Sequence, residues 1–212
     1  MILYKNYISR EAWLKARKNS IGASEAAIAC GISKFKTQSQ LWREKTGRAK
    51  ESDLSDNELV AYGTEAEQYL RALFALKHKE YKIDYFPYKV YYRLETPHIT
   101  CTLDGEITTS DGLKGIYECK TKLITRKDDL EEWNGKIPDN YFIQCLQQLY
   151  CTDFDFVVLN AELRFPDNSA EIREYVIDKH KHISDIEWTI SEVQTFWEYI
   201  ERDKQPPEIL KL

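Results

Sequence analysis

Residues 102–106, Thr-Leu-Asp-Gly-Glu, and residues 117–120, Tyr-Glu-Cys-Lys, decide the fold that the sequence predicts. Each segment lies within an apolar run, at 99–107 and 115–121, of the kind that is typical of a β-strand. Ser-Asp-Gly at 110–112 provides a turn between the two runs. The sequence therefore predicts two adjacent antiparallel strands that carry acidic residues.

Asp104 and Glu118 should come close together on these strands, and Lys120 should face the same side as Glu118 because side chains alternate along a strand. Two carboxylates a few ångströms apart repel by about 4 kcal/mol at an effective dielectric constant near 20, so the pair requires a cation. Oxygen ligands of this kind suit Mg²⁺ or Mn²⁺, which can hold a phosphate and activate water. Lys120 would position or deprotonate that water. Taken alone, however, a Glu-x-Lys pattern favours a surface ion pair.

The rest of the chain predicts helices and strands around this pair. Their periodicity, caps and turn residues place them as follows: helices at 9–18, 23–30, 58–79, 139–151 and 184–201, strands at 88–94, 156–165 and 171–177, and loops at 50–58 and 126–135. The strand at 88–94 would complete a three-strand antiparallel meander. This order predicts one mixed α/β domain over residues 1–212, with a central mixed sheet flanked by helices.

Two predicted helices present polar side chains that could belong to the same site. Glu67 lies on the apolar face of its helix, where a carboxylate is costly unless it is paired or near a metal ion. A position at the rim of the apolar stripe is the alternative. Gln144 shares a helix face with Tyr141 and Gln148, and a solvent-facing helix edge would give the same pattern.

Arg17 and Ser24 form a candidate anion site near the start of the chain. Arg17 comes near the end of one predicted helix, and Ser24 lies in the first turn of the next, after a turn that contains Gly22. Free N–H groups, a hydroxyl and a guanidinium together suit a phosphate group. An ordinary helix cap is the alternative role for Ser24.

Composition limits the class of protein. Residues 1–50 hold 11 Lys and Arg against 3 Asp and Glu, a balance of +8, which leaves −13 of the total of −5 for the remainder. The basic part suits phosphate binding, although a solvated helical face explains it equally well.

Five scattered cysteines without a Cys-x-x-Cys pattern argue against disulfides, structural zinc and an iron–sulfur cluster. With no apolar run long enough for a membrane span, and no signal peptide, we expect a cytoplasmic protein without a membrane partner.

Six short motifs, taken together, carry a family resemblance. They are Trp-Leu-Lys-Ala-Arg at 13–17, Ile-Gly-Ala-Ser-Glu at 21–25, Gly-Thr-Glu-Ala-Glu at 63–67, Leu-Asp-Gly at 103–105, Glu-Cys-Lys at 118–120 and Tyr-Phe-Ile-Gln at 141–144. In order and spacing they resemble the YqaJ-like viral recombinase family, which includes the phage lambda exonuclease and belongs to the P-D-(D/E)-x-K nucleases. The resemblance covers residues of about 13 to 150 and implies a restriction-endonuclease-like core.

The resemblance also implies roles for particular residues and for the whole protein. Asp104, Glu118 and the Cys119 carbonyl would bind the metal ion, Lys120 would handle the water, Glu67 and Gln144 would support them, and Arg17 and Ser24 would hold a 5′-phosphate. The implied activity is processive 5′-to-3′ hydrolysis of duplex DNA from its ends, which leaves a 3′ strand for a single-strand annealing protein. The implied assembly is a homo-oligomer, a ring-shaped trimer.

Two positions depart from the family pattern. Leu103 stands where the motif has Pro, at a position that supplies no ligand atom, and Gln147 stands where relatives often carry His. One alternative function is that of another nuclease of the same fold, such as a restriction endonuclease or a CRISPR-adaptation nuclease; the latter normally has four clustered cysteines. A DNA-end-binding protein without catalysis is a second alternative, although it would be expected to have lost at least one of Asp104, Glu118 and Lys120.

Overall fold

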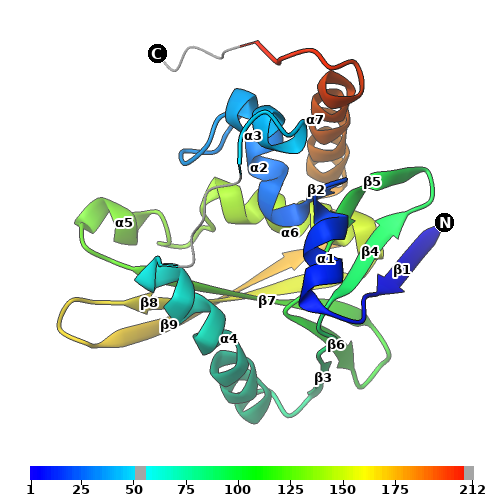
Figure 1. Ribbon diagram of the computed structural model, residues 1–212. Helices are drawn as coiled ribbons and strands as arrows, with labels where there is room; N and C mark the ends of the chain where they lie inside the picture. Colours follow the sequence, from blue (N-terminus) through cyan, green and yellow to red (C-terminus); the bar gives the residue numbers. More distant parts are fainter. Residues whose placement is uncertain (51–55, 208–212) are drawn as a thin grey trace.

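Two β-sheets form the centre of the computed structural model, which describes residues 1–50 and 56–207 (Figure 1). The strands are β1 Ile2–Asn6, β2 Ile21–Gly22, β3 Tyr81–Asp84, β4 Lys89–Arg93, β5 Thr96–Cys101, β6 Gly105–Thr109, β7 Lys114–Leu123, β8 Phe156–Arg164 and β9 Ala170–Asp178. The smaller sheet has the order β1-β4-β5-β2 and the larger sheet β3-β6-β7-β8-β9. Both contain one parallel pair, β2 with β5 and β7 with β8. The predicted mixed α/β class is confirmed.

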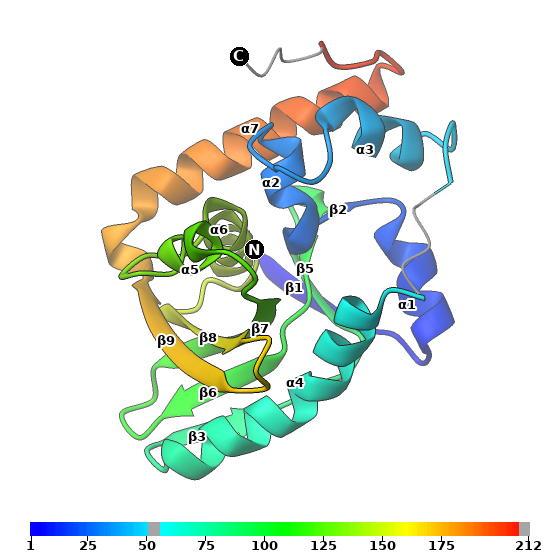
Figure 2. The same ribbon diagram turned by 90° about the vertical axis from the view of Figure 1, so that its left-hand side faces the viewer.

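Helices cover both sides of the larger sheet. They are α1 Arg10–Arg17, α2 Ala26–Ala29, α3 Gln38–Lys45, α4 Glu58–Lys77, α5 Lys127–Glu131, α6 Asp139–Thr152 and α7 Ile183–Glu201. In Figure 2, α4 lies along one side of the molecule and α7 along the opposite side, with α6 between α7 and the strands. The connection from β7 to its parallel neighbour β8 passes through α5 and α6, as a parallel pair requires.

The predicted single strand at 99–107 is wrong. Residues 96–101 form β5 in the smaller sheet, whereas residues 105–109 form β6 in the larger sheet. The chain passes from one sheet to the other at residues 102–104, so the predicted three-strand meander is divided between the two sheets. Gly105 makes the crossing compact, because a Cβ atom there would lie 3.2 Å from side-chain atoms of both Ile83 and Tyr117.

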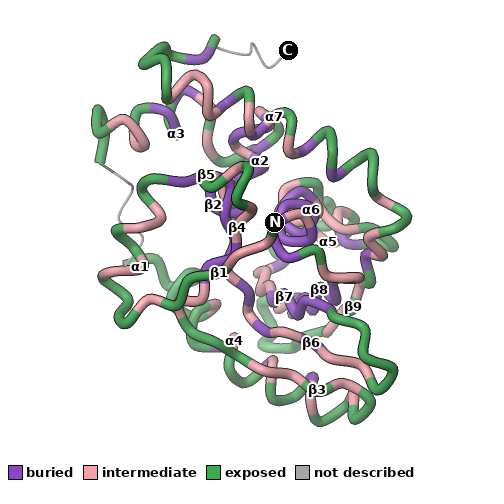
Figure 3. The backbone as a smooth tube through the Cα atoms, turned by 90° about the vertical axis from the view of Figure 1, so that its right-hand side faces the viewer, coloured by how far each residue is buried: buried purple, intermediate pink, exposed green. Residues whose placement is uncertain are grey.

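The main core lies between α6 and the strands. Figure 3 shows buried residues concentrated along α6 and along β7 and β8. The α6 side chains Cys145, Leu146 and Leu149 are almost fully buried and pack in one cluster with residues of β8 and α7. A second cluster joins α4 to the other face of the larger sheet through Leu70, Phe74 and neighbours. The larger sheet is thus held on both faces, which fixes β7 in the middle of the molecule.

The sequence analysis missed several short elements and made one helix too long. β1, β2, β3, α3 and α5 were not predicted as strands or helices, and α5 occupies part of the predicted loop at 126–135. The predicted helix at 23–30 is a 3-10 turn at Ala23–Glu25 followed by the single turn of α2. Most of the loop predicted at 50–58 falls on residues 51–55, which lie outside the described part. Within 1–50 and 56–207, no helix combines the length and apolar character needed to span a membrane.

Candidate active site

One cleft brings together the side chains that the sequence singled out. Its volume is about 500 Å³, and it lies where α1, the 3-10 turn, α4, the 102–104 crossing, β7 and α6 meet. We call it the central cleft. Its lining includes Arg17, Ser24, Glu67, Asp104, Glu118, Lys120 and Gln144. Residues up to 134 positions apart in the sequence, Arg10 and Gln144, therefore line one cleft.

Asp104 occupies the crossing between the two sheets. Its Oδ2 atom accepts a hydrogen bond from the Cys119 N–H at 2.9 Å, and its carbonyl accepts one from the Arg71 guanidinium at 2.8 Å. The regular pairing of β6 with β7 ends at Tyr117, so the Asp104 carboxylate takes the place of a further strand residue beside Cys119. Burial, together with the nearby Glu118 carboxylate, raises the pKa of Asp104 well above its ordinary value.

Glu118 is buried, with 2% of its surface exposed, and hydrogen bonds surround its carboxylate. Lys120 Nζ and Gln144 Nε2 each donate to Oε1 at 2.5 Å, and Gln148 Nε2 donates to Oε2 at 2.6 Å. A buried carboxylate is tolerated only with such partners, because an unpaired charge in this position would destabilise the fold by several kcal/mol. The two glutamines on α6 thus hold Glu118 in a fixed orientation toward the cleft.

Lys120 faces the same side of β7 as Glu118. Burial alone would lower the pKa of the Lys120 ammonium group, but the Glu118 and Asp104 carboxylates outweigh burial and raise it. The centroid of the Tyr141 ring lies 5.4 Å from Lys120 Nζ. In this arrangement Lys120 is a cation, which favours positioning and charge compensation over proton acceptance.

Glu67 points from α4 toward the same carboxylate pair. It is partly buried, and desolvation raises its pKa, with Lys120 and Arg71 acting in the opposite direction and Glu118 adding to the rise. One turn earlier, Gly63 allows α4 to approach β7, since a Cβ atom there would lie 3.2 Å from Thr121 Oγ1. The helix therefore brings a third carboxyl group to the cleft, rather than leaving Glu67 at a solvent-exposed rim.

Arg17 and Ser24 meet in the lining of the same cleft. The Arg17 guanidinium donates to Ser24 Oγ at 3.1 Å and lies 4.7 Å from the Trp13 ring. The turn between them is rigid, because Glu25 accepts the Gly22 N–H at 2.9 Å and forms an ion pair with Lys45 at 2.8 Å. Ser24 is exposed and contacts a guanidinium, so the pair presents a hydroxyl and a cation to an anion.

Some cleft residues were missed by sequence reasoning. Arg10 and Trp13 line the cleft from the same face of α1 as Arg17, and the spacing of three, four and seven residues could have revealed them. Tyr85 lies over the Arg71 guanidinium, with 3.9 Å from Cζ to the ring centroid, and also lines the cleft. No sequence pattern indicated Tyr85, because it lies in the connection between β3 and β4.

The donor set fits a hard divalent cation, although it is not a preassembled cage. No cluster of three or more His, Cys, Asp or Glu side chains is spaced to hold a metal ion among residues 1–50 and 56–207. The carboxylates of Asp104 and Glu118 nevertheless face one cleft, and Gln148 Oε1 is buried beside them without a hydrogen-bond partner in the described structure. In a strand, the N–H and C=O of one residue point to the same neighbour, so the Cys119 carbonyl also points toward Asp104. All these candidate donors are oxygen atoms, as Mg²⁺ and Mn²⁺ prefer.

Solved structures with similar folds include several exonucleases. An alkaline exonuclease from Laribacter hongkongensis, LHK-Exo, matches with a TM-score of 0.64 and 19% identity, over 91% of this chain and 93% of that one. Its complex with dAMP gives a TM-score of 0.65 and 20% identity over the same shares. A phage related exonuclease from Haemophilus somnus 129PT gives 0.58 and 18%, over 87% and 96%. At these identities the similarity shows a shared fold.

Sequence comparison identifies the family. The uncharacterized protein YqaJ of Bacillus subtilis (strain 168) is 32% identical over an alignment of 158 residues that covers 68% of this chain and 43% of YqaJ. The chain thus spans less than half the length of this curated relative. The model of the YqaJ-like viral recombinase domain matches residues 12–155. This range contains all the cleft residues that the sequence predicted. The chain therefore belongs to the YqaJ-like viral recombinase family.

Proposed function

We propose that this protein is a metal-dependent exodeoxyribonuclease that hydrolyses linear duplex DNA in the 5′-to-3′ direction from 5′-phosphorylated ends. One observation carries the proposal: a single cleft holds both a carboxylate–lysine centre and the Arg17–Ser24 anion site. The first can act on a phosphodiester bond, and the second can hold a terminal phosphate. The exonucleases with the same fold support the choice of DNA as substrate.

The cleft residues would divide the chemistry among them. Asp104, Glu118 and the Cys119 carbonyl would hold a divalent cation, Mg²⁺ or Mn²⁺, which supplies charge neutralisation at the scissile phosphate and a more acidic water. Lys120 would orient the attacking water and offset phosphate charge as a cation. Gln144 fixes the Glu118 carboxylate through its hydrogen bond. Glu67 lines the same cleft, and its raised pKa would make it a better proton acceptor.

The Arg17–Ser24 site would select the end of the substrate. A terminal phosphate monoester carries more negative charge than an internal phosphodiester, so a guanidinium with a hydroxyl favours a 5′-phosphorylated end over a 5′-hydroxyl end. Binding of the terminal phosphate in the same cleft in which hydrolysis occurs would release short products from the 5′ terminus. The complementary strand would remain with a 3′ single-stranded tail.

The proposal extends to partners that the resemblance implies. A single-strand annealing recombination protein would receive the 3′ strand, and the working form would be a homo-oligomer, a ring trimer, in the cytoplasm. Light scattering coupled to size exclusion measures the oligomeric state directly. A monomer at working concentrations would remove the ring from the proposal and leave the chemistry of the cleft unaffected.

The test is digestion of three DNA substrates in Mg²⁺ or in EDTA: a linear duplex with 5′-phosphates, the same duplex with 5′-hydroxyls, and a closed circle. We expect Mg²⁺-dependent loss of the 5′-phosphorylated linear DNA alone, and no activity for Lys120→Ala. Lys122→Ala is the matched control, because Lys122 is the next residue on the same face of β7 and pairs with Asp129 at 3.8 Å. Labels at the 5′ or 3′ end report the direction.

Each alternative function gives a different result in the same assay. Cutting of the closed circle would identify an endonuclease of the same fold. Tight binding of linear ends without hydrolysis in Mg²⁺ or Mn²⁺ would identify a DNA-end-binding protein. Activity that persists fully in Lys120→Ala would refute the assignment of the chemical centre.

A further inference from the structure

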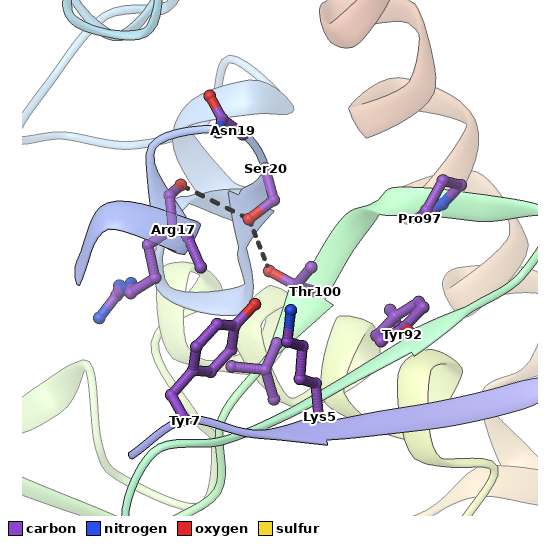
Figure 4. A pocket seen from close by; sticks show the side chains of 10 residues that line it. Lys5, Tyr7, Arg17, Asn19, Ser20, Tyr92, Pro97 and Thr100 are labelled. Carbon is purple, nitrogen blue, oxygen red and sulfur yellow. Dashed lines mark hydrogen bonds between the residues drawn. The ribbon is translucent and has the colours of Figure 1, made fainter. Parts of the chain in front are cut away.

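A second pocket lies beside the central cleft on the smaller sheet. Its volume is about 270 Å³, and we call it the outer pocket (Figure 4). Arg17, Val90 and Thr100 line both the outer pocket and the central cleft. The Arg17 carbonyl is turned to the outer pocket, where Ser20 Oγ donates to it at 3.5 Å, whereas its guanidinium contacts Ser24 in the cleft. The two cavities are therefore neighbours on either side of Arg17.

The register of the smaller sheet explains the composition of this pocket. Lys5 lies opposite Val90, and Leu3 lies opposite Tyr92, so these side chains share one face of the sheet. The other face, with Tyr91 and Ile99, packs into the main core. α1 covers only part of the outward face. A cavity therefore remains over β1 and β4, between α1 and the β5 side of the sheet.

The outer pocket combines a cation with aromatic rings. Lys5 extends between Tyr7 and Tyr92, and its ammonium group points toward Ser20 and Thr100 (Figure 4). Lys5 Nζ lies 5.1 Å from the Tyr7 ring centroid and has no ion-pair partner among the described residues. Ser20 and Thr100, whose hydroxyls lie 3.0 Å apart, form a buried polar floor.

The charge of the lining selects an anionic ligand. The lining that the structure describes contains the Lys5 ammonium group and no carboxylate, in a molecule with a formal net charge of −5; the Arg17 guanidinium adds its charge from the neighbouring cleft. Aromatic rings beside a cation are the features with which proteins bind single-stranded DNA, where bases stack on rings and phosphates meet lysine or arginine. The volume is just below the range of about 300–1,000 Å³ for small-molecule pockets, so it suits a single nucleotide and excludes a duplex.

We propose that the outer pocket binds one nucleotide of single-stranded DNA next to the central cleft. The inference rests on the proposed function, since a nuclease that works from duplex ends has single strands at this place. They have two sources: an unpaired 5′ tail that precedes the attacked end, and the 3′ strand that remains after hydrolysis. In both cases a base would stack on Tyr7 or Tyr92, and a phosphate would meet Lys5.

The test is equilibrium binding of fluorescent duplexes in EDTA, where no hydrolysis occurs. The probes are a blunt 5′-phosphorylated duplex and the same duplex with a short thymidine tail at the 5′ or the 3′ end. We expect at least one tail to strengthen binding by about tenfold, because this is the order of magnitude of the affinity that one base gains by stacking on an aromatic ring. The tail that produces the gain identifies the source of the strand.

Variants assign the gain to the pocket. Lys5→Gln and Tyr92→Leu should reduce the affinity for the tailed duplex to that for the blunt duplex and change blunt binding less than twofold. Lys77→Gln and Tyr69→Leu, at exposed positions of α4, are the matched controls and should keep the gain. Lys5 is exposed, so its variant will fold even where Tyr92→Leu does not.

The two proposals fail in different ways. Absence of a tail-dependent gain, or equal weakening of blunt and tailed binding by Lys5→Gln, would overturn the outer-pocket assignment even if hydrolysis of the blunt duplex in Mg²⁺ is normal. A gain that depends on Lys5, in a protein that hydrolyses no DNA in Mg²⁺ or Mn²⁺, would support the pocket and overturn the nuclease function.

Discussion

Two adjacent glutamines on α6 show how neighbouring buried residues can serve different purposes. Gln147 and Gln148 are both fully buried. Gln147 donates to the carbonyls of Ile21 and Thr100, both at 2.9 Å, and so joins the strands of the smaller sheet to α6. Gln148 instead donates to Glu118 in the cleft. The two side chains lie about 100° apart around the helix, so Gln147 contacts the smaller sheet and Gln148 contacts Glu118.

The first prediction separates these two roles. Gln148→Leu should lower kcat by about tenfold or more, because Glu118, the carboxylate proposed to bind the metal ion, loses a partner that orients it. Gln147→Leu should leave kcat nearly unchanged and lower the free energy of unfolding by about 1–3 kcal/mol, because two buried carbonyls lose their donor. Urea unfolding and single-turnover hydrolysis measure the two effects. Equal effects of both substitutions on kcat would contradict the division.

At the scale of elements, the position of α4 depends on a small residue. Gly63 faces Thr121 on β7, and Glu67 follows one helical turn later. A side chain at 63 therefore controls the distance between α4 and the larger sheet, and with it the distance of Glu67 from the carboxylate pair.

The second prediction uses this contact. Gly63→Ala should be close to neutral, because the gain of about 1 kcal/mol in helix propensity offsets a contact that is a few tenths of an ångström too short. Gly63→Leu should move α4 outward and reduce kcat by about tenfold while the protein stays folded. Hydrolysis rates and circular dichroism of both variants check this. Full activity of Gly63→Leu would show that the helix position is not critical.

The third prediction concerns the contact between β5 and α7. His98 stacks on Trp197, with 4.7 Å between ring centroids, and Nε2 lies 2.9 Å from Gln194 Oε1. Burial lowers the pKa of His98, so the neutral ring is favoured in the folded state. The neutral His98 ring therefore contributes to the free energy of unfolding. This contribution is fully present above the pKa of about 6.5 that histidine has in the unfolded chain, and it is lost as the pH falls from there through the lower pKa of the folded state.

Urea unfolding at neutral and mildly acidic pH measures this linkage. The wild type should lose more stability between these pH values than His98→Phe, which keeps the ring stacking and cannot be protonated. Parallel pH profiles of the two proteins would show that His98 does not contribute.

The element scale also shows what sequence reasoning can find. Cys101, Leu103 and Ile107 continue one alternating pattern, so nothing in the sequence marked the change of sheet between β5 and β6. The pattern persists because residues on both sides of the crossing face buried clusters. By contrast, α3 carried a readable signal: Thr37 and Gln40 form a capping box at its first turn. The cleft residues were found because their spacing follows motifs, whereas Tyr85 belongs to none.

At the scale of the whole molecule, charge is distributed unevenly. Residues 1–50 carry a net charge of +8, and the exposed cations of this part include Lys15 and Lys18, at and just after the end of α1. Neither has an ion-pair partner among the described residues. Lys34 and Lys127, in contrast, pair with Glu132 and Glu131. The unpaired cations are therefore available to the phosphates of the proposed DNA substrate.

The fourth prediction is a change in salt dependence. Each phosphate contact that is lost should reduce the slope of log affinity against log salt concentration by about 0.9. The double variant Lys15→Gln/Lys18→Gln should thus reduce the slope by up to about 2, whereas Lys34→Gln/Lys127→Gln should leave it unchanged. Titration of a blunt duplex at several salt concentrations, in EDTA, gives these slopes. Equal slopes for both double variants would show that α1 does not contact the duplex.

The position of Asp104 has one more consequence. It lies at the junction of the two sheets, while Glu118 belongs to the middle of the larger one. A cation bound by both would fasten the junction to β7, and unfolding would have to release it. Occupancy of the site is then linked to the cohesion of the entire domain, and a cation at 100 times its dissociation constant would add about 2.7 kcal/mol to the free energy of unfolding. The same bound cation would then be required for hydrolysis of the substrate and would also raise the temperature at which the domain unfolds.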